Sequence, residues 1–105
     1  MFTLDTVLDH TTLTLCLVGE LSNDVAYLPS ETAANAFAEN PAVISEVVLD
    51  LFAVTFTDST GLAALVRVRE LADAHGARCR LRGVRPRTRQ LLEMTGLLAT
   101  FDGLT

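Results

Sequence analysis

Two segments near the N-terminus alternate apolar and polar residues, a pattern typical of strands that bury one face. They span residues 2–8 and 12–18. The apolar residues of the second segment fall on a single face: Leu13, Leu15 and Leu17. Asp9-His10-Thr11 separates the two segments and has the composition of a hairpin turn. The chain is therefore predicted to open with an antiparallel hairpin.

The middle of the chain holds a nearly continuous apolar run, Val47–Phe52. Such a run predicts a strand that is covered on both faces, and residues 53–57 are interpreted as a short connection after it. Residues 78–84 alternate again and predict another strand, with Cys79, Leu81 and Gly83 on one side and Arg78, Arg80 and Arg82 on the other.

Three segments have helical patterns. The first covers about residues 30–39, with Ser30 as its N-cap and Ala33 and Phe37 facing inward. Residues 22–29, which precede it, carry mixed signals and receive no assignment. The second helix runs from Asp58 to about His75, and its apolar stripe follows the i, i+3, i+4, i+7 spacing: Gly61, Ala64, Leu65, Val68, Leu71, Ala72 and His75. The third covers about residues 86–95, and residues 97–105 are interpreted as a short tail.

The predicted order is β-β-α-β-α-β-α. Strands that alternate with helices imply parallel crossover connections, added here to the initial hairpin. We therefore expect one α/β domain over residues 1–105, with a mixed sheet of four to five strands and about three helices packed mostly on one face.

Composition and charge narrow the function classes. The chain has 105 residues, 50% of them hydrophobic, and a net charge of −5. Its first 66 residues hold nine acids and no base, whereas residues 67–105 hold four acids and all eight arginines. The acidic total argues against nonspecific nucleic-acid binding. No apolar run is long enough to span a bilayer, and no basic N-terminal region suggests a secretory signal. We expect a cytoplasmic protein with free thiols.

Few residues have the spacing that catalysis or metal binding requires. His10 and His75 are isolated, and neither Cys16 nor Cys79 pairs with a histidine at ligand spacing. No nucleophile motif, pair of catalytic acids or glycine-rich phosphate loop is present. We expect neither an enzyme nor a bound metal or cofactor.

One position combines polar and apolar features. Ser59 and Thr60 lie where the buried strand gives way to the long helix. One interpretation is capping, in which Asp58 or Ser59 accepts a hydrogen bond from a free helix N–H group. The other starts from a second helix face beside the core stripe, formed by Ser59, Leu62, Ala63 and Val66. This face either packs against a neighbouring element or forms a docking surface with a modifiable hydroxyl at its edge.

Phosphorylation of that hydroxyl would act as a switch. A phosphate adds roughly −1.5 to −2 charges at pH 7. The helix N-terminus tolerates an anion, whereas a partner docked on Leu62 and Val66 would have to bury the charge beside Asp58. Modification would therefore release the partner without unfolding the domain.

The same region resembles a known family. Val48-Leu49-Asp50-Leu51 and the stretch from Val54 to Leu62, with its Asp-Ser-Thr-Gly-Leu element, are similar to the centre of STAS domains. The nearest branch is the bacterial anti-sigma factor antagonists. Further matches follow along the chain: Gly19-Glu20-Leu21, Gly76-Ala77 and the segment from Arg89 to Leu97, which includes Thr95-Gly96-Leu97.

The resemblance implies a partner switch. An unmodified antagonist binds an anti-sigma factor that is a serine kinase of the GHKL type, and this frees the sigma factor. The kinase phosphorylates the serine after the motif aspartate, here Ser59, and a metal-dependent phosphatase restores it. Thr60 is the secondary phosphorylation candidate. A monomer fits such a transient switch.

The residues expected to contact the partner come from two segments: Asp58, Thr60, Gly61, Leu62 and Val66, together with Ser22 and Asp24. Leu62 and Val66 are inferred from helix geometry. Ser22 departs from the family pattern, which often has an aspartate directly after Gly-Glu-Leu, whereas here Asp24 follows two residues later. A different class of function stays open, in which the STAS domain is an unphosphorylated structural subunit of a lipid-transport or signalling complex.

Overall fold

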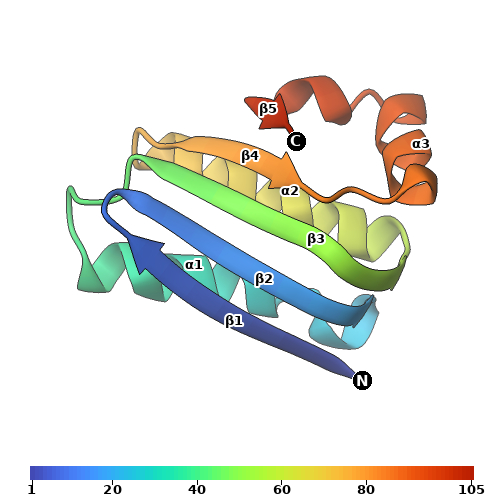
Figure 1. Ribbon diagram of the computed structural model, residues 1–105, viewed down its shortest axis with the longest axis horizontal. Coiled ribbons are helices and arrows are strands. Elements are labelled where there is room, and N and C mark those ends of the chain that lie inside the picture. Colours follow the sequence, from blue (N-terminus) through green and yellow to red (C-terminus); the bar gives the residue numbers. More distant parts are fainter.

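The computed structural model describes residues 1–105 and contains one five-stranded sheet (Figure 1). The strands are β1 (Phe2–Asp9), β2 (Thr12–Leu21), β3 (Glu46–Thr57), β4 (Arg78–Arg82) and β5 (Gly103–Leu104), and they lie side by side in this order. β1 and β2 pair antiparallel, and every later neighbour pairs parallel. The predicted hairpin and mixed sheet are confirmed.

Two of the three helices lie on one side of the sheet (Figure 1), in keeping with the expectation of helices packed mostly on one face. The three helices are α1 (Leu28–Glu39), α2 (Ser59–Ala74) and α3 (Pro86–Met94), with short 3₁₀ turns at Asn23–Val25 and Leu98–Thr100. In the figure α1 and α2 lie behind the sheet, and α3 lies beyond β4. None of the helices combines the length and apolar composition that crossing a bilayer requires.

The core fills the space between the sheet and these helices. The inward leucines of β2 are buried, as are Leu65 and Val68 of α2 and Ala33 and Phe37 of α1. The stripes predicted for α1 and α2 are therefore confirmed over most of their length. His75 is the exception, because it lies exposed at the end of α2 with its ring stacked on Phe37 at a centroid distance of 4.3 Å.

Several predicted boundaries are wrong. The strand predicted over residues 12–18 runs on to Leu21, and the one predicted over residues 78–84 ends at Arg82. Residues 53–57 belong to β3, because shifts in the β2–β3 register allow pairing to continue through Gly19–Val54 and Leu21–Thr57. The prediction ended the strand with the continuous apolar run at Phe52, and the bulged pairing beyond that residue follows no simple pattern in the sequence. Helix α1 begins at Leu28 with Tyr27 as its N-cap residue.

Ser30 is therefore not the N-cap of α1. It lies inside the first turn, where its hydroxyl donates a hydrogen bond to the Tyr27 carbonyl oxygen at 3.3 Å. Pro29 is tolerated in this turn because its missing N–H would have no partner there. The interpreted tail also contains structure, since Gly103–Leu104 adds β5 to the sheet.

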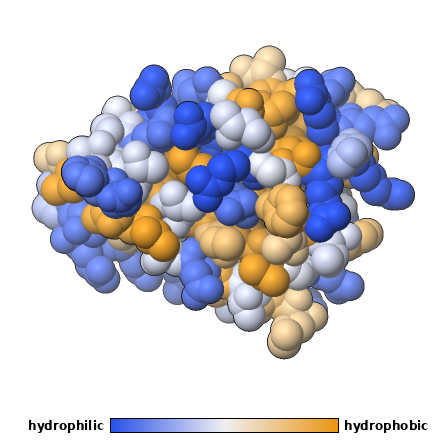
Figure 2. Space-filling view, in the orientation of Figure 1, coloured by the Kyte–Doolittle hydropathy of each residue, from blue (hydrophilic) through white to orange (hydrophobic).

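One face of the sheet has no helix over it, so the expectation that β3 is covered on both faces is wrong. Val47, Val48, Leu49 and Leu51 are buried, but Phe52 is 71% exposed. Figure 2 shows this uncovered side, where hydrophobic and hydrophilic residues reach the surface side by side. We call it the open face.

The start of α2 lies tightly against the ends of two strands. A Cβ atom on Gly61 would overlap the Thr57 hydroxyl and the carbonyl oxygen of Leu21. Leu21 and Thr57 are paired at the ends of β2 and β3. Only a residue without a side chain therefore allows the first turn of α2 to approach the ends of these two strands so closely.

We expect Gly61→Ala to destabilise the protein. Alanine is the better helix former by about 1 kcal/mol, but the overlap with backbone and core atoms costs about 1–3 kcal/mol or more. The net loss should appear as a lower denaturation midpoint in urea. Ala63→Ser, at an exposed position of the same helix, is the control and should change stability by no more than about 0.5 kcal/mol. Unchanged stability of Gly61→Ala would show that the turn can move away from the sheet.

Candidate functional site at the start of helix α2

The aspartate between β3 and α2 caps the helix. Asp58 has extended backbone angles (φ −117°, ψ −169°), and its carboxylate accepts a hydrogen bond from the Gly61 N–H at 2.9 Å. The Thr60 hydroxyl donates to the same oxygen at 2.6 Å. Of the two capping candidates the structure therefore selects Asp58.

The same contacts set the charge of the cap. Hydrogen bonds donated by the Thr60 hydroxyl and then by the Gly61 N–H lower the pKa of Asp58 below its ordinary value of 3.8. Thr60 is partly buried, and its hydroxyl is occupied by this bond. The motif acid is thus ionised, and Thr60 is the less accessible of the two neighbouring hydroxyl groups.

Ser59 is in a different situation. It is the first residue of α2 and is exposed, and its hydroxyl makes no hydrogen bond with another protein group. Because Asp58 carries out the capping, the Ser59 hydroxyl is free to react or to bind. Its place at a helix N-terminus is one where a negative charge is favoured.

A surface hollow of about 480 Å³ adjoins Ser59. Its lining residues come from α2 and from the segment after α3: Ser59, Leu62, Ala63, Val66, Arg67, Glu70, Thr95 and Leu97. The second helix face predicted from the sequence therefore lines one hollow together. We call it the Ser59 hollow.

Leu62 corrects part of that prediction. It is only 5% exposed and packs in the hydrophobic core, because it lies at the edge of the buried stripe of α2. Ala63 is exposed and Val66 partly exposed, so these two form the accessible apolar surface of this helix face. The expectation that Leu62 is exposed is therefore wrong, although it contributes to the lining of the hollow.

Ser22 and Asp24 lie apart from the Ser59 hollow. They follow the end of β2, and Ser22 precedes the short 3₁₀ turn. Together with Met1, Phe2, Glu20 and Val25 they line a separate hollow of about 220 Å³. Because Leu21 pairs with Thr57, both segments follow the C-terminal ends of neighbouring strands, β2 and β3. No common hollow joins them.

Four hollow residues were not predicted as site residues: Arg67, Glu70, Thr95 and Leu97. Arg67 and Glu70 also line a second hollow of about 590 Å³ between α1 and α2. Arg67 is held by a hydrogen bond from its guanidinium to the carbonyl oxygen of Ala26, at 3.3 Å. Thr95 and Leu97 come from a distant part of the chain, so periodicity within α2 carries no signal for them.

The remaining reactive groups lie elsewhere. Cys79 is buried on β4, and desolvation raises the pKa of its thiol to about 12. Cys16 is a free, partly exposed thiol on β2. No group of three or more histidine, cysteine, aspartate or glutamate side chains is arranged to hold a metal ion.

The family comparison agrees with this geometry. A family model for the STAS domain matches residues 3–104. The chain belongs to the STAS domain family. No curated protein sequence matches it.

Several solved structures share the fold of this STAS domain. An anti-sigma factor antagonist from Mycobacterium paratuberculosis has a TM-score of 0.81 and 24% identity, over 99% of this chain and 86% of that one. The Bacillus cell fate determinant SpoIIAA in its phosphorylated form has a TM-score of 0.69 and 23% identity, over 100% and 92%. A sulfate transporter family protein from Wolinella succinogenes has a TM-score of 0.73 and 19% identity, over 93% and 80%.

The cap predicts a pH dependence. Because the pKa of Asp58 is lowered in the folded state, the ionised group stabilises the STAS domain above the ordinary pKa of 3.8, and this contribution is lost as the pH falls through the lower folded-state value. Asp58→Asn keeps an acceptor oxygen but cannot ionise. We expect wild type to melt at a higher temperature than Asp58→Asn near neutral pH, with the difference shrinking below pH 3.8.

Circular dichroism melts at a series of pH values measure this difference. Asp24→Asn is the matched control, since it removes the same charge from an exposed carboxylate that makes no hydrogen bond. A constant difference between wild type and Asp58→Asn at all pH values would contradict an ionised cap.

Proposed function

We propose that this STAS domain is an anti-sigma factor antagonist controlled by phosphorylation at Ser59. In its unphosphorylated form it binds a GHKL-type serine-kinase anti-sigma factor and frees the sigma factor. The observation that carries the proposal is the exposed, unbonded Ser59 hydroxyl, which lies at the rim of an apolar hollow and directly follows the capping Asp58.

The chemistry is a phosphoryl transfer between ATP and the serine. The Ser59 oxygen forms a bond to the γ-phosphorus of ATP as the bond to the bridging oxygen of ADP breaks, and the hydroxyl proton passes to a base of the kinase. A metal-dependent serine phosphatase later hydrolyses the ester. This chain supplies an accessible acceptor oxygen, so both enzymatic activities belong to its partners and the STAS domain itself is not an enzyme.

The hollow accounts for release of the partner. Its lining includes the apolar groups of Ala63, Val66 and Leu97, which favour contact with apolar side chains of a partner. A phosphate on Ser59 would place about two negative charges at the rim, beside ionised Asp58. A partner covering the hollow would have to desolvate these charges, whereas the free domain leaves them in water.

Comparison with neighbours supports this choice. Two of the structural neighbours are an anti-sigma factor antagonist and a phosphorylated SpoIIAA. Under this proposal the domain acts in the cytoplasm, without nucleic acid or membrane contacts. The alternative is a structural STAS subunit of a transport or signalling complex, and the sulfate transporter family neighbour favours it.

Phosphorylation of Ser59 is tested with ATP and the kinase-type anti-sigma factors of the same host. Intact mass and peptide mapping should detect one added phosphate on Ser59. Ser59→Ala should abolish the phosphorylation and keep partner binding. It should change the free energy of unfolding by no more than about 0.5 kcal/mol, because Ser59 does not cap the helix. Thr60→Ala is the control and should still accept phosphate.

The outcomes separate the alternatives. Phosphate on Ser59→Ala would move the modification to Thr60. No phosphate on wild type with any of these kinases, together with co-purification of a transport ATPase, would favour the structural subunit.

The Ser59 hollow is tested by adding a charge to its lining. Ala63→Asp should weaken binding of the anti-sigma factor by about tenfold or more, since the partner must bury the carboxylate. Because Ala63 is exposed, the free energy of unfolding should change by no more than about 0.5 kcal/mol. Isothermal titration calorimetry measures the affinity, and Ala74→Asp is the control, with the same change on α2 outside the hollow.

Binding unaffected by Ala63→Asp would exclude the hollow as the docking surface. Leu62→Asp is unsuitable for this test, because it would place a carboxylate in the core and report on folding.

A further inference from the structure

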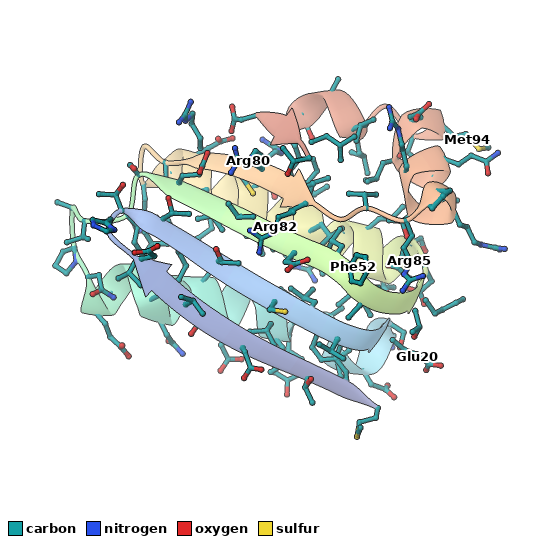
Figure 3. All side chains as sticks on the ribbon, viewed as in Figure 1. Glu20, Phe52, Arg80, Arg82, Arg85 and Met94 are labelled. Carbon is teal, nitrogen blue, oxygen red and sulfur yellow. The ribbon has the colours of Figure 1, made fainter.

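The open face carries apolar side chains that no helix of the chain covers. The Arg85 guanidinium lies 5.8 Å from the centre of the Phe52 ring and shields only part of it. Phe52 is 71% exposed and Val7 59% exposed, and Phe56 and Val18 also present large apolar surfaces. Figure 3 shows Phe52 on the side of the sheet turned away from α1 and α2. Apolar groups that gather on one exposed face mark interaction sites.

Charges on the open face are separated from one edge to the other. Strand pairing places Asp9, Thr12, Glu46 and Arg78 in one row across the sheet, and Asp5, Cys16, Asp50 and Arg82 in another. Each row runs from an acid on β1 to an arginine on β4. A row of Val7, Thr14, Val48 and Arg80 lies between them.

The acids of β3 already have arginine partners, whereas those of β1 do not. Asp50 accepts a hydrogen bond from Arg82 at 3.0 Å, and Glu46 lies 3.5 Å from Arg80 and 3.8 Å from Arg78. Asp5 makes no ion pair, and Asp9 contacts only His10. The β1 edge therefore presents unneutralised carboxylates, and Arg78 and Arg82 still reach solvent.

We propose that the open face binds a second copy of this chain, face to face, about a twofold axis parallel to the strands between β2 and β3. This axis places β1 of each copy over β4 of the other. Arg82 then faces Asp5 of the second copy, and Arg78 faces Asp9 of the second copy. The exposed apolar residues of β2 and β3, Val18, Phe52 and Phe56, meet between these charged edges, whereas Val7 on β1 faces Arg80 of the second copy.

The other in-plane axis is excluded by charge. A twofold axis perpendicular to the strands would place β4 on β4 and bring arginines opposite arginines, which is unfavourable. Charge complementarity thus selects both the occupant and its orientation. A dimer differs from the expectation of a monomer, which depended only on the demands of a transient switch and stays the alternative that the measurement below tests.

The size of the face limits the area that the dimer can bury. Four strands about 4.8 Å apart and up to ten residues long cover about 19 by 30 Å, or about 600 Å² in each copy. This is below the roughly 800 Å² per partner of a standard stable interface. The dimer is therefore weak and depends on concentration.

The two surfaces are independent. Residues of α2 and of the segment after α3 line the Ser59 hollow, and α2 lies on the opposite side of the sheet from the open face (Figure 1). The dimer proposal does not rest on the proposed function.

Sedimentation velocity over a dilution series tests the dimer. Wild type should shift from monomer to dimer as concentration rises. Phe52→Asp should raise the dissociation constant by about thirtyfold or more, because a carboxylate on the central strand β3 would be buried in the interface. Tyr27→Asp, at a residue 57% exposed on the helix side, is the control and should dimerise like wild type. Both variants should fold, as melting curves would check.

Two outcomes would overturn the proposal. One is a wild-type protein that stays monomeric at every concentration. The other is a dimer that persists unchanged in Phe52→Asp.

Orientation is tested with charge and with the native thiol. Asp5→Arg would face Arg82 of the second copy and should weaken the dimer about tenfold, whereas Asp24→Arg, away from the sheet face, should not. With sheets about 10 Å apart, the two Cys16 residues lie about 11 Å from each other. Cys79 is buried, so a bis-maleimide of that span should link two copies through Cys16 alone.

Cys16→Ser and Phe52→Asp should both abolish this cross-link. Efficient cross-linking in Phe52→Asp, or equal affinity of Asp5→Arg and wild type, would overturn the proposed orientation.

Discussion

The close approach of α2 to the sheet organises the rest of this molecule. Gly61 lies where a Cβ atom would overlap the Thr57 hydroxyl and the Leu21 carbonyl oxygen, so the helix begins directly against the ends of β2 and β3. Asp58 is the only residue between strand and helix, and its carboxylate accepts a hydrogen bond from the Gly61 N–H. The capping group, the free hydroxyl of Ser59 and the hollow beside it all follow from this one contact.

Within these three residues, Asp58 and Thr60 stabilise the start of the helix, and Ser59 is left available for modification. Asp58 and Thr60 are engaged with each other and with the helix backbone, whereas Ser59 projects from the same turn without a hydrogen bond. A change of charge on Ser59 therefore alters the surface that a partner meets and leaves the cap intact.

Local patterns in the sequence predicted the fold class well, because the leucines of β2 and the stripe of α2 face a single core. They failed where tertiary contacts determine the end of a strand or the burial of a residue. Register shifts hid the continuation of β3, and Leu62 lies at the boundary between buried and exposed helix faces, where spacing alone cannot assign it. Ser59 was predicted from its junction and from the family resemblance. Thr95 and Leu97 join the hollow only through the packing of a distant segment.

The fold places the acidic and the arginine-rich parts of the sequence on different strands of the sheet. Strands follow one another across the sheet in chain order, so the acidic strand β1 forms one edge and the arginine-rich strand β4 lies next to β5 at the other. A face with opposite charges at its two edges is complementary to itself after a half-turn about the strand direction. Apolar residues such as Phe52 lie between those edges, where a second copy would exclude water. Two copies joined in this way would each keep a Ser59 hollow exposed, so dimerisation and partner binding would use opposite sides of the same sheet.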